Sequence, residues 1–300
     1  DGQFARYEAP LLRAFGEAGL TVDLAEDHPP AETDFIVFAP GGQVADFRPY
    51  TRTRAVMGLW AGVESIVTND TLTQPLARMV DDGMTQGMVE YVVGHVLRHH
   101  IGMDDHIVNP GHAWNHRTTP LASDRPVTVL GLGALGSACA RALADFGFPV
   151  TGWSRSPKVI DGVTCLYGAE GFDRALDGAQ IVVLLVPLTA ATENLLDAAA
   201  LSRLAPGAFV VNPGRGALID DGALLEALDS GGIAHATLDV FRTEPLPADH
   251  PFWSHPQVTV TPHVASETRP ITASRVIAEN VRRAVAGEPL LHLVDRKRGY

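Results

Sequence analysis

The sequence predicts an α/β fold whose parallel sheet is covered by helices on both faces, and three observations predict it. A four-residue apolar run at 127–130 enters Gly-x-Gly-x-x-Gly at 131–136 and continues into good helix formers at 137–143. The run at 181–186 is apolar without alternation, as in parallel strands buried on both faces. Further short apolar runs alternate with helical stretches, which is typical of a doubly wound sheet.

Composition bounds the class of protein. The chain has 300 residues, of which 46% are hydrophobic, so it is long enough for two domains with a sizeable core. The net charge of -12 argues against a nucleic-acid partner, and the short basic run at 296–298 reads as a solvated tail. No apolar run reaches about 18 residues, so we expect no membrane span, and residues 1–3 do not begin a basic, apolar leader. Two cysteines, Cys139 and Cys165, are too few for a disulfide framework and indicate a cytoplasmic protein.

The first elements are a helix and three short strands. Apolar positions at helical spacing predict a helix over 8–20, closed by Gly19. Strands are predicted at 21–24, 35–38 and 55–59. Because an α/β layer normally begins with a strand, we expect one more strand before residue 1. Trp60, Ala61 and Gly62 then form either a carboxylate-binding turn with bare N–H groups or an ordinary strand-to-helix connection.

A long helix is predicted over 85–103. Its broad apolar stripe suits a hinge between layers or a subunit contact. The stripe consists of Met88, Val89, Val92, Val93, Val96, Leu97 and Ile101. His95 and His99 lie four residues apart on this helix, with four further histidines beyond, but no Glu follows the first His and no Cys accompanies them. We therefore predict surface or interface histidines and no metal site.

The rest of the chain alternates strands with helices after a connecting loop at 109–126. Strands are predicted at 150–153, 163–167, 181–186, 208–212, 236–240 and 258–261. Asp221 is the expected N-cap of a helix at 223–228, with Gly231 just past its end. The last helix, 275–286, should end at Gly287, and 290–294 should return as an extended segment to the first layer.

The glycine motif has the order that a dinucleotide-binding turn needs. Gly131 allows a sharp turn off the strand, Gly133 lets N–H groups approach a pyrophosphate, and Gly136 allows close packing of helix on sheet. The motif alone is a weak signal. Its place between a strand and a helix makes it a prediction of dinucleotide binding.

The residues after the next strand favour NADP. An NAD site would carry an acidic residue at this strand end, but Trp153 is followed by Ser154, Arg155 and Ser156. Arg155 offers a fork of donors to a 2′-phosphate, and the serines offer hydroxyls. The alternative is an exposed loop arginine. We predict NADP as the cofactor, with NAD as the weaker alternative.

Three polar residues follow the ends of predicted strands, where open α/β sheets place their ligands. They are Arg215 in Asn-Pro-Gly-Arg-Gly, Glu244 in Glu-Pro-Leu-Pro and His263 in Thr-Pro-His. Each alone is common, but their order along the chain indicates a catalytic set.

With these motifs the chain resembles the D-isomer-specific 2-hydroxyacid dehydrogenases over nearly all of its length. The resemblance rests on the glycine turn, on Val-Pro-Leu-Thr at 186–189 with Thr192, and on the three segments just described. Trp-Ala-Gly-Val at 60–63, Trp-Ser-Arg-Ser at 153–156 and Ser-Glu-Thr-Arg-Pro at 266–270 make it similar to the glyoxylate/hydroxypyruvate reductase A branch.

The resemblance implies two doubly wound domains. A Rossmann NAD(P) domain at 85–265 would be inserted into a discontinuous, flavodoxin-like substrate domain at 1–84 and 266–300, whose first strand this sequence lacks. The active site would lie between the domains. The helix from Thr85 would take part in a homodimer interface.

The resemblance also implies roles for the candidate catalytic residues. His263 would donate a proton as general acid, and the Glu244 carboxylate would favour the imidazolium form and one tautomer. Arg215 would bind the substrate carboxylate and the keto oxygen.

The remaining expected contacts are to substrate and cofactor. The amides of Ala61 and Gly62 would take the other carboxylate oxygen, and Trp60 would wall a small pocket. The cofactor would contact Gly131, Gly133, Leu135, Gly136, Ser154, Arg155, Ser156, Val186, Pro187, Thr192, Asp239 and His263.

We therefore expect NADPH-dependent reduction of small 2-oxo acids, glyoxylate to glycolate and hydroxypyruvate to D-glycerate. The alternative from another class is a dinucleotide-sensing interaction protein, because corepressors use the same fold and keep the same three residues. A third possibility is the same fold acting on formate or phosphite as hydride donor. Arg269 either faces the substrate pocket or caps the last helix.

Overall fold

The computed structural model describes residues 2–107, 109, 111–114 and 116–299. The chain divides into two compact units, Asp1–Met84 with Glu267–Tyr300, and Thr85–Ser266. The predicted loop at 109–126 includes Pro110 and Asn115, which lie outside the described residues. The roles assigned above to the two parts of the chain stay predictions at this stage.

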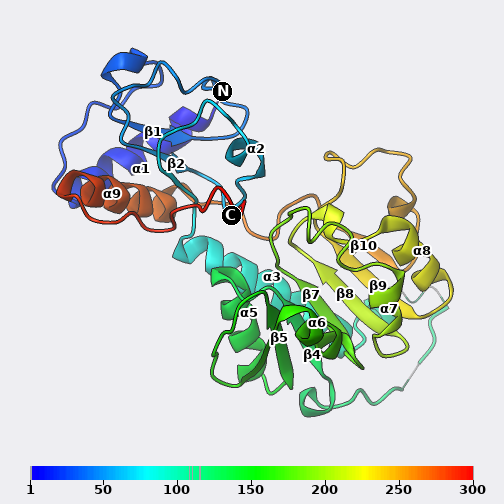
Figure 1. Cartoon of the computed structure of the whole chain (residues 1–300). Helices are drawn as coiled ribbons and strands as arrows, with labels where there is room; N and C mark the ends of the chain where they lie inside the picture. Colours follow the sequence, from blue (N-terminus) through cyan, green and yellow to red (C-terminus); the bar gives the residue numbers. More distant parts are fainter. Residues whose placement is uncertain (1, 108, 110, 115, 300) are drawn as a thin grey trace. The chain divides into compact units, whose positions relative to one another are not determined.

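Within the described part of the second unit, seven strands form one parallel sheet in the order β10-β9-β8-β7-β4-β5-β6 (Figure 1). The strands are β4 (Val127–Leu130), β5 (Val150–Ser154), β6 (Val163–Tyr167), β7 (Ile181–Leu184), β8 (Ala208–Asn212), β9 (Ile233–Leu238) and β10 (Val258–Val260). Every neighbouring pair is parallel. The chain builds outward from β4 to β6 and then returns to β7 on the other side of β4, so the strand order reverses between β4 and β7. Ligands of open α/β sheets bind at such a switch point.

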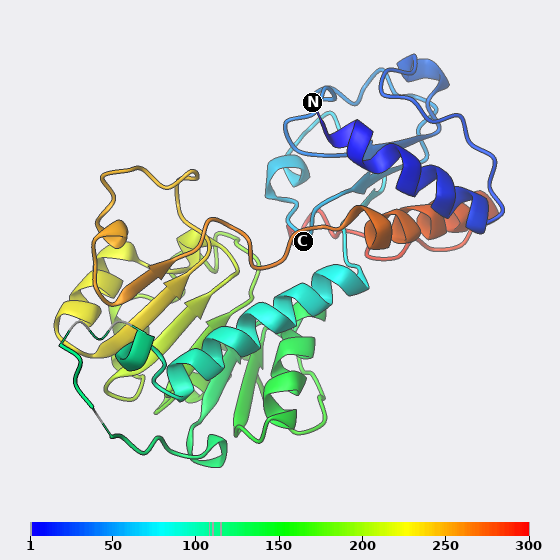
Figure 2. The same ribbon diagram turned by 180° about the vertical axis from the view of Figure 1, so that it is seen from behind.

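Helices cover both faces of this sheet (Figures 1 and 2). They are α3 (Asp82–His100), α5 (Ala134–Asp145), α6 (Gly168–Leu176), α7 (Ala198–Ser202) and α8 (Asp221–Asp229). Alternate residues of one strand belong to different cores: Val183 packs with side chains of α3 and α5, whereas Val182 packs with side chains of α6, α7 and α8. The predicted doubly wound α/β class is confirmed, because the strands are apolar on both sides.

The histidines at the end of α3 correct the sequence analysis. Met88, Val92 and Val96 of the predicted stripe are buried in the core. The prediction of surface or interface histidines is wrong for His99 and His100, which are only 3% and 7% exposed. His99 continues the stripe one turn beyond Val96, stacks on the Phe209 ring and lies 2.9 Å from the Thr237 hydroxyl through Nε2. Burial lowers the pKa of His99 to about 2.

We expect acidification to lower the stability of the protein already at pH values well above those at which carboxylates titrate. At pH values above the ordinary histidine pKa of 6.5, His99 is neutral in the folded and the unfolded chain. Below it, only the unfolded chain binds a proton there, so the free energy of unfolding falls by about 1.4 kcal/mol per pH unit. His235, whose pKa burial lowers to about 4, acts in the same direction. Urea denaturation at pH 7, 6 and 5 should show the fall, and H99Q should show a shallower one. A wild-type stability that stays constant over this range would contradict the burial of neutral histidines.

The first unit is a smaller layer of the same kind. Its described residues form a three-stranded parallel sheet, β1 (Phe35–Phe38), β2 (Ala55–Gly58) and β3 (Leu76–Ala77), in that order. The helices α1 (Gln3–Glu17) and α9 (Pro270–Ala286) lie side by side although they come from opposite ends of the chain (Figure 2). The predicted return of 290–294 is confirmed, because the Val294 N–H donates to the Leu76 carbonyl oxygen at 2.8 Å.

Several element boundaries differ from the prediction. The predicted strand at 21–24 is absent, since these described residues belong to neither sheet. The N-cap of α8 is Asp220 rather than Asp221, since its carboxylate accepts from the Ala223 N–H at 3.0 Å. The helix α9 begins at Pro270, a residue suited to the first helical turn, and Arg269 is its N-cap by backbone position without a side-chain capping bond.

The remaining helical segments are short. They are α2 (Glu64–Val67), α4 (Asp104–Ile107) and the 3₁₀ turns Pro30–Glu32, Ala122–Asp124, Gly216–Leu218 and Pro251–Trp253. Among helices built from described residues, none combines the length and the apolar character needed to cross a membrane.

Candidate active site

The glycine turn follows β4 and has no room for larger residues at two of its three positions. Gly131 has a φ of +107°, and a Cβ atom on it would lie 2.5 Å from the Leu185 carbonyl carbon. A Cβ atom on Gly136 would lie 1.7 Å from the Gly131 carbonyl oxygen. The turn is therefore packed against the end of β7, at the switch point of the sheet.

Gly133 has the opposite surroundings, and they fit an anion. A Cβ atom on Gly133 would meet no heavy atom within 4 Å. Gly133 is the N-cap of α5 and supplies no side-chain acceptor, so the first N–H groups of the helix, those of Ala134 and Leu135, have no partner inside the helix. Open space in front of bare N–H groups at a helix N-terminus is what a pyrophosphate needs. The residues present thus fit a dinucleotide.

The loop after β5 lies beside this turn, because the Gly131 N–H donates to the Trp153 carbonyl oxygen at 2.8 Å. Ser154 is buried, and its hydroxyl donates to the Ser156 carbonyl oxygen at 2.8 Å. Arg155 and Ser156 are exposed. Ser154 therefore folds the loop, while Arg155 and Ser156 remain accessible to a 2′-phosphate.

The loop after β7 completes the cofactor side. Val186 is buried, and the Thr192 hydroxyl donates to the Pro187 carbonyl oxygen at 2.7 Å while accepting from the Thr189 N–H at 2.8 Å. These bonds close the loop on itself. It follows the strand next to β4, so it lies at the same edge of the sheet as the glycine turn.

Asn212 holds the turn that carries Arg215 through two hydrogen bonds. This buried amide donates to the Arg215 carbonyl oxygen at 2.9 Å and accepts from the Gly214 N–H at 3.1 Å. A Cβ atom on Gly216 would lie 2.0 Å from the Phe241 carbonyl carbon. The Arg215 turn therefore touches the segment that leads to Glu244.

Glu244 and His263 form a pair. His263 Nδ1 lies 2.7 Å from Glu244 Oε2, and the other carboxylate oxygen accepts from the Phe241 N–H at 2.8 Å. The His263 side chain is about half exposed. The backbone of His263 has a φ of +55°, which is uncommon for a residue other than glycine and is frequent at functional sites.

Asp239 fixes the His263 turn. It is fully buried, and its carboxylate accepts from the Thr261 hydroxyl at 2.6 Å and from the N–H groups of Val264 and Ala265 at 2.9 Å. Its carbonyl oxygen accepts from the His263 N–H at 2.8 Å. These bonds give the Asp239 side chain a supporting role in the His263 turn, and its contact with the cofactor stays a prediction.

Four supporting residues were missed by the sequence analysis: Asn212, Gly216, Thr261 and Tyr91. The Tyr91 hydroxyl lies 2.8 Å from the Thr261 hydroxyl, and burial raises the pKa of Tyr91. A polar residue at the end of a continuous apolar strand, such as Asn212, is the signal from which a support of this kind can be inferred.

The turn at 60–62 belongs to the first unit. Its backbone is anchored on both sides, since the Trp60 carbonyl oxygen accepts from the Met79 N–H at 3.0 Å and the Leu59 carbonyl oxygen accepts from the Thr268 hydroxyl at 2.7 Å. The N–H groups of Ala61 and Gly62 donate to no described residue. Trp60 is 42% exposed. The turn thus has the bare donors that a carboxylate binds.

No group of three or more His, Cys, Asp or Glu side chains within the described residues is arranged to hold a metal ion. His95 and His99 point to neighbours in the core instead: His95 contacts the Tyr91 ring and His99 contacts Phe209.

Comparison with known proteins agrees with this geometry. Residues 92–265 match the sequence model of the D-isomer specific 2-hydroxyacid dehydrogenase NAD binding domain. The chain belongs to the D-isomer specific 2-hydroxyacid dehydrogenase family. The matched range includes the glycine turn, Arg215, Glu244 and His263. Membership makes the chain an oxidoreductase.

Relatives of known name place the chain in one branch of the family. It is 42% identical over 257 residues to glyoxylate/hydroxypyruvate reductase A of Serratia proteamaculans, with 83% of this chain and 82% of the relative covered. The enzyme of the same name from Yersinia enterocolitica is 41% identical over 255 residues, with 82% of each chain covered. The resemblance to the glyoxylate/hydroxypyruvate reductase A branch is confirmed.

Solved structures of relatives have the same fold. A D-isomer specific 2-hydroxyacid dehydrogenase from Xanthobacter autotrophicus Py2, in complex with NADPH and MES, matches with a TM-score of 0.92 and 38% identity, over 99% of this chain and 96% of that one. NADPH-dependent glyoxylate/hydroxypyruvate reductase from Sinorhizobium meliloti, in complex with NADP and sulfate, matches with a TM-score of 0.87 and 34% identity, over the same shares of the chains.

Proposed function

We propose that this protein is an NADPH-dependent reductase of small 2-oxo acids, which converts glyoxylate to glycolate and hydroxypyruvate to D-glycerate. One observation carries the proposal: the Glu244–His263 pair and the open Gly133 turn follow strands of one parallel sheet at their carboxyl ends. The names of the relatives supply the substrates, and the NADPH and NADP in their structures supply the cofactor.

When bound, the nicotinamide supplies the hydride that reduces the keto carbon. Negative charge then builds on the keto oxygen, and a proton must reach it. His263 is the donor in this proposal, because Nδ1 is held by Glu244 and the side chain is about half exposed. The Glu244 carboxylate orients the imidazole through Nδ1, so that Nε2 is the ring nitrogen left to deliver a proton.

Arg215 binds the substrate in this proposal. Its guanidinium can donate to the substrate carboxylate and to the keto oxygen, and so stabilises the negative charge that develops. The N–H groups of Ala61 and Gly62 would hold the second carboxylate oxygen, and the Trp60 ring would limit the size of the group attached to the keto carbon. A pocket that admits only small groups suits glyoxylate and hydroxypyruvate.

A substrate panel tests the proposal. Loss of reduced cofactor is followed with glyoxylate, hydroxypyruvate and pyruvate, each with NADPH and with NADH. We expect turnover of the first two with NADPH at a higher kcat/KM than with NADH. An inactive but correctly folded enzyme that still binds NADPH would instead favour a dinucleotide-sensing interaction protein, a role that none of the relatives reported above carries in its name.

Arg155→Ala tests the choice of cofactor. Removing a charge-assisted bond to the 2′-phosphate at an exposed site should raise the KM for NADPH by about tenfold and leave kcat/KM with NADH nearly unchanged. Arg141→Ala is the matched control, because Arg141 is an exposed arginine on α5. An R155A enzyme that keeps the wild-type preference for NADPH would exclude Arg155 from the cofactor site.

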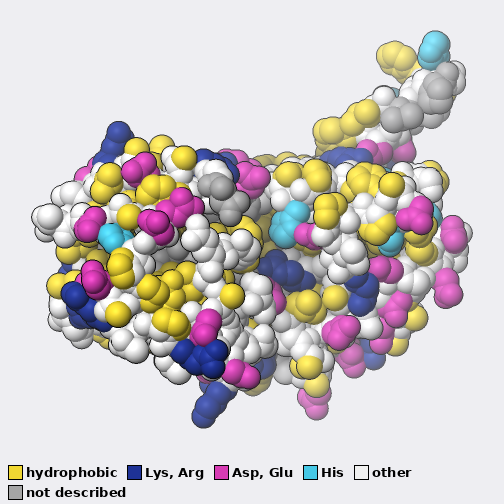
Figure 3. Space-filling view, turned by 90° about the horizontal axis from the view of Figure 1, so that it is seen from above, with side chains coloured by type: hydrophobic (Ala, Val, Ile, Leu, Met, Phe, Trp, Pro, Cys, Tyr) yellow, Lys and Arg dark blue, Asp and Glu magenta, His cyan; other side chains and the backbone are white. Residues whose placement is uncertain are grey.

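We further propose that the enzyme is a homodimer. Ile107, Trp114 and Leu121 are 64%, 96% and 71% exposed, and all three belong to the part of the second unit between α3 and β4. A projecting segment there carries hydrophobic side chains (Figure 3). Exposed apolar side chains gathered in one segment indicate a protein interface. Sedimentation equilibrium should give twice the 32.0 kDa chain mass; a monomer at micromolar concentration would contradict this.

The proposed cytoplasmic location fits two cysteines that are both free.

A further inference from the structure

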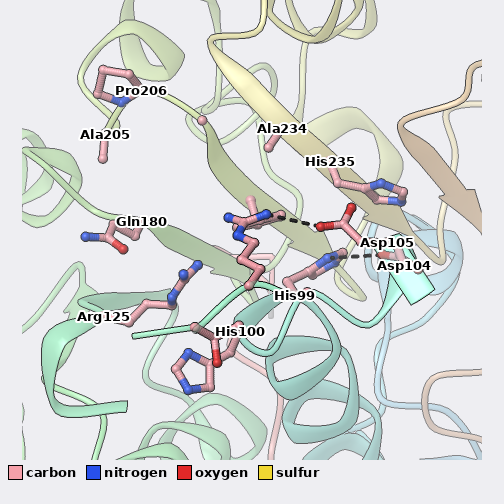
Figure 4. Close-up of a pocket in the computed structure, with 15 residues that line it drawn as sticks. His99, His100, Asp104, Asp105, Arg125, Gln180, Ala205, Pro206, Ala234 and His235 are labelled. Carbon is pink, nitrogen blue, oxygen red and sulfur yellow. Dashed lines mark hydrogen bonds and ion pairs between the residues drawn. The ribbon is translucent and has the colours of Figure 1, made fainter. Parts of the chain in front are cut away.

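A cavity lies at the edge of the large sheet that is formed by the amino ends of its strands. Its volume is about 580 Å³, and the close-up in Figure 4 shows the side chains that surround it. Arg125, Gln180 and Pro206 come from the segments that lead into β4, β7 and β8, at the amino ends of these strands. The glycine turn follows the carboxyl end of β4, and Asn212 is the last residue of β8. The cavity is thus separate from the candidate active site, and the proposed reaction does not use it.

Arg125 is a buried arginine that lines this cavity. It is only 9% exposed, its guanidinium lies over the Phe209 ring at 5.7 Å, and its Nε atom is buried without a hydrogen-bond partner. It forms no ion pair with any described residue. Burial lowers the pKa of Arg125, and the nearby Arg117 lowers it further. A buried cation without a counter-charge is unfavourable unless an anion binds beside it.

The acidic residues of the cavity do not supply that counter-charge. Asp104 pairs with Arg98 at 2.6 Å, and Asp105 pairs with Arg117 at 3.1 Å. Both aspartates are therefore neutralised by arginines other than Arg125. The cavity keeps one unbalanced positive charge.

Neutral donors surround this charge. His100 is 7% exposed, lines the cavity and has a buried Nδ1 atom without a hydrogen-bond partner among the described residues. His99 Nδ1 is likewise buried without a hydrogen bond, although an Asp104 oxygen lies 3.9 Å away. Gln180 adds a side-chain amide to the lining. Arg125, His100 and Gln180 thus line one cavity with a planar fork of N–H groups, an imidazole and an amide.

We propose that this cavity binds a metabolite through an oxyanion group, either a phosphoryl group or a carboxylate, held by Arg125 with His100 and Gln180. The guanidinium fork matches both kinds of oxyanion. A cavity of this size accepts a molecule larger than the oxyanion alone, since pockets for small metabolites have volumes on the order of 300–1,000 Å³. Because the cavity lies at the other edge of the sheet, the ligand binds together with the dinucleotide rather than in its place.

Inorganic phosphate and malonate are the probes, titrated at constant ionic strength while the melting temperature of the full-length protein is followed. One of the two should raise the melting temperature in a saturable way, and which one does so identifies the class of oxyanion. Arg125→Gln should weaken the apparent affinity about tenfold or more. Arg203→Gln is the matched control, because Arg203 is a more exposed arginine of the same unit that is paired with Asp173 and Asp177. The titration is repeated in Arg155→Ala, so that phosphate bound at the cofactor site is recognised by its loss there.

Saturable binding that R125Q loses and both R155A and R203Q keep supports the proposal. Binding that R125Q keeps, or an absence of saturable binding with both probes, overturns it. If R125Q instead converts a dimer to a monomer and wild type binds neither probe, the counter-charge comes from a second copy of the chain and the metabolite site is wrong. R125Q should fold, since it removes an unpaired buried charge; Gln180→Ala provides a second variant, with an expected weakening of several-fold.

Discussion

Replacing His263 with Gln should lower kcat for glyoxylate by about a hundredfold or more and leave the KM for NADPH nearly unchanged. A Gln side chain fits the same space and its amide can still donate a hydrogen bond to Glu244, but it cannot deliver a proton to the keto oxygen. The supporting bonds from Asp239 run to the backbone of the 263–265 turn and to Thr261, so the turn should keep its conformation in the variant. Steady-state kinetics with saturating NADPH measure the effect.

Two further variants control this result. Glu244→Gln should cause a smaller loss of kcat than H263Q, because the imidazole remains and only its orientation and charge are less well supported. His28→Gln, at a histidine of the first unit, should leave kcat unchanged. If H263Q kept more than a tenth of the wild-type kcat, or if E244Q were the more damaged of the two, His263 would not be the proton donor.

Replacing Arg215 with Gln should lower kcat/KM for the 2-oxo acid by about 10² to 10³-fold, the usual effect of removing a group that stabilises a developing oxyanion. The main-chain position of the turn should survive, because Asn212 holds it through the Arg215 carbonyl oxygen and the Gly214 N–H. The affinity for NADPH, measured by quenching of protein fluorescence, should not change.

Arg215→Lys separates shape from charge. Lysine keeps the positive charge but lacks the planar fork, so it should recover only a small part of the lost kcat/KM. Arg203→Gln, at a surface arginine of the same unit, should have wild-type kinetics. Full activity in R215K would show that a point charge is enough, and full activity in R215Q would remove Arg215 from the substrate site.

The large sheet was predictable because its strands carry their own signal. The run at Ile181–Leu184 is apolar at every position and every one of these residues is buried in the structure. The segment at 21–24 was also predicted as a strand, but it belongs to neither sheet of the described residues. A strand needs a neighbour, and pairing is a property of the fold rather than of the four residues themselves. The two-residue strand β3 was missed for the same reason.

The buried polar residues were the least predictable part. His99 stacks on Phe209 and contacts Thr237, both more than a hundred positions away, and Asp239 binds the backbone of 264 and 265. Hydrogen-bond partners so distant in sequence have no local pattern. Residue spacing alone predicted surface or interface histidines, whereas the packing of α3 on the sheet buries His99 and His100.

The candidate catalytic residues were predictable as a set but not as a geometry. Glu244 and His263 stand 19 positions apart, and the structure brings them together because β9 and β10 are parallel neighbours whose carboxyl ends meet at one edge. The order of the motifs indicated these residues as candidates, and their catalytic roles stay predictions. The structure was needed to show which nitrogen of His263 faces the carboxylate. It was also needed to show that Gly216 lets the Arg215 turn approach Phe241.

In the proposed reaction a hydride passes from NADPH to the keto carbon of a small 2-oxo acid. Its most direct test is the transfer of isotope from NADPH that carries deuterium at nicotinamide C4, on the transferred face, to hydroxypyruvate. The account predicts D-glycerate with one deuterium at C2, formed by the wild-type enzyme and at least about a hundredfold more slowly by H263Q. Glycerate without deuterium, or no glycerate from a folded enzyme that binds NADPH, would contradict it.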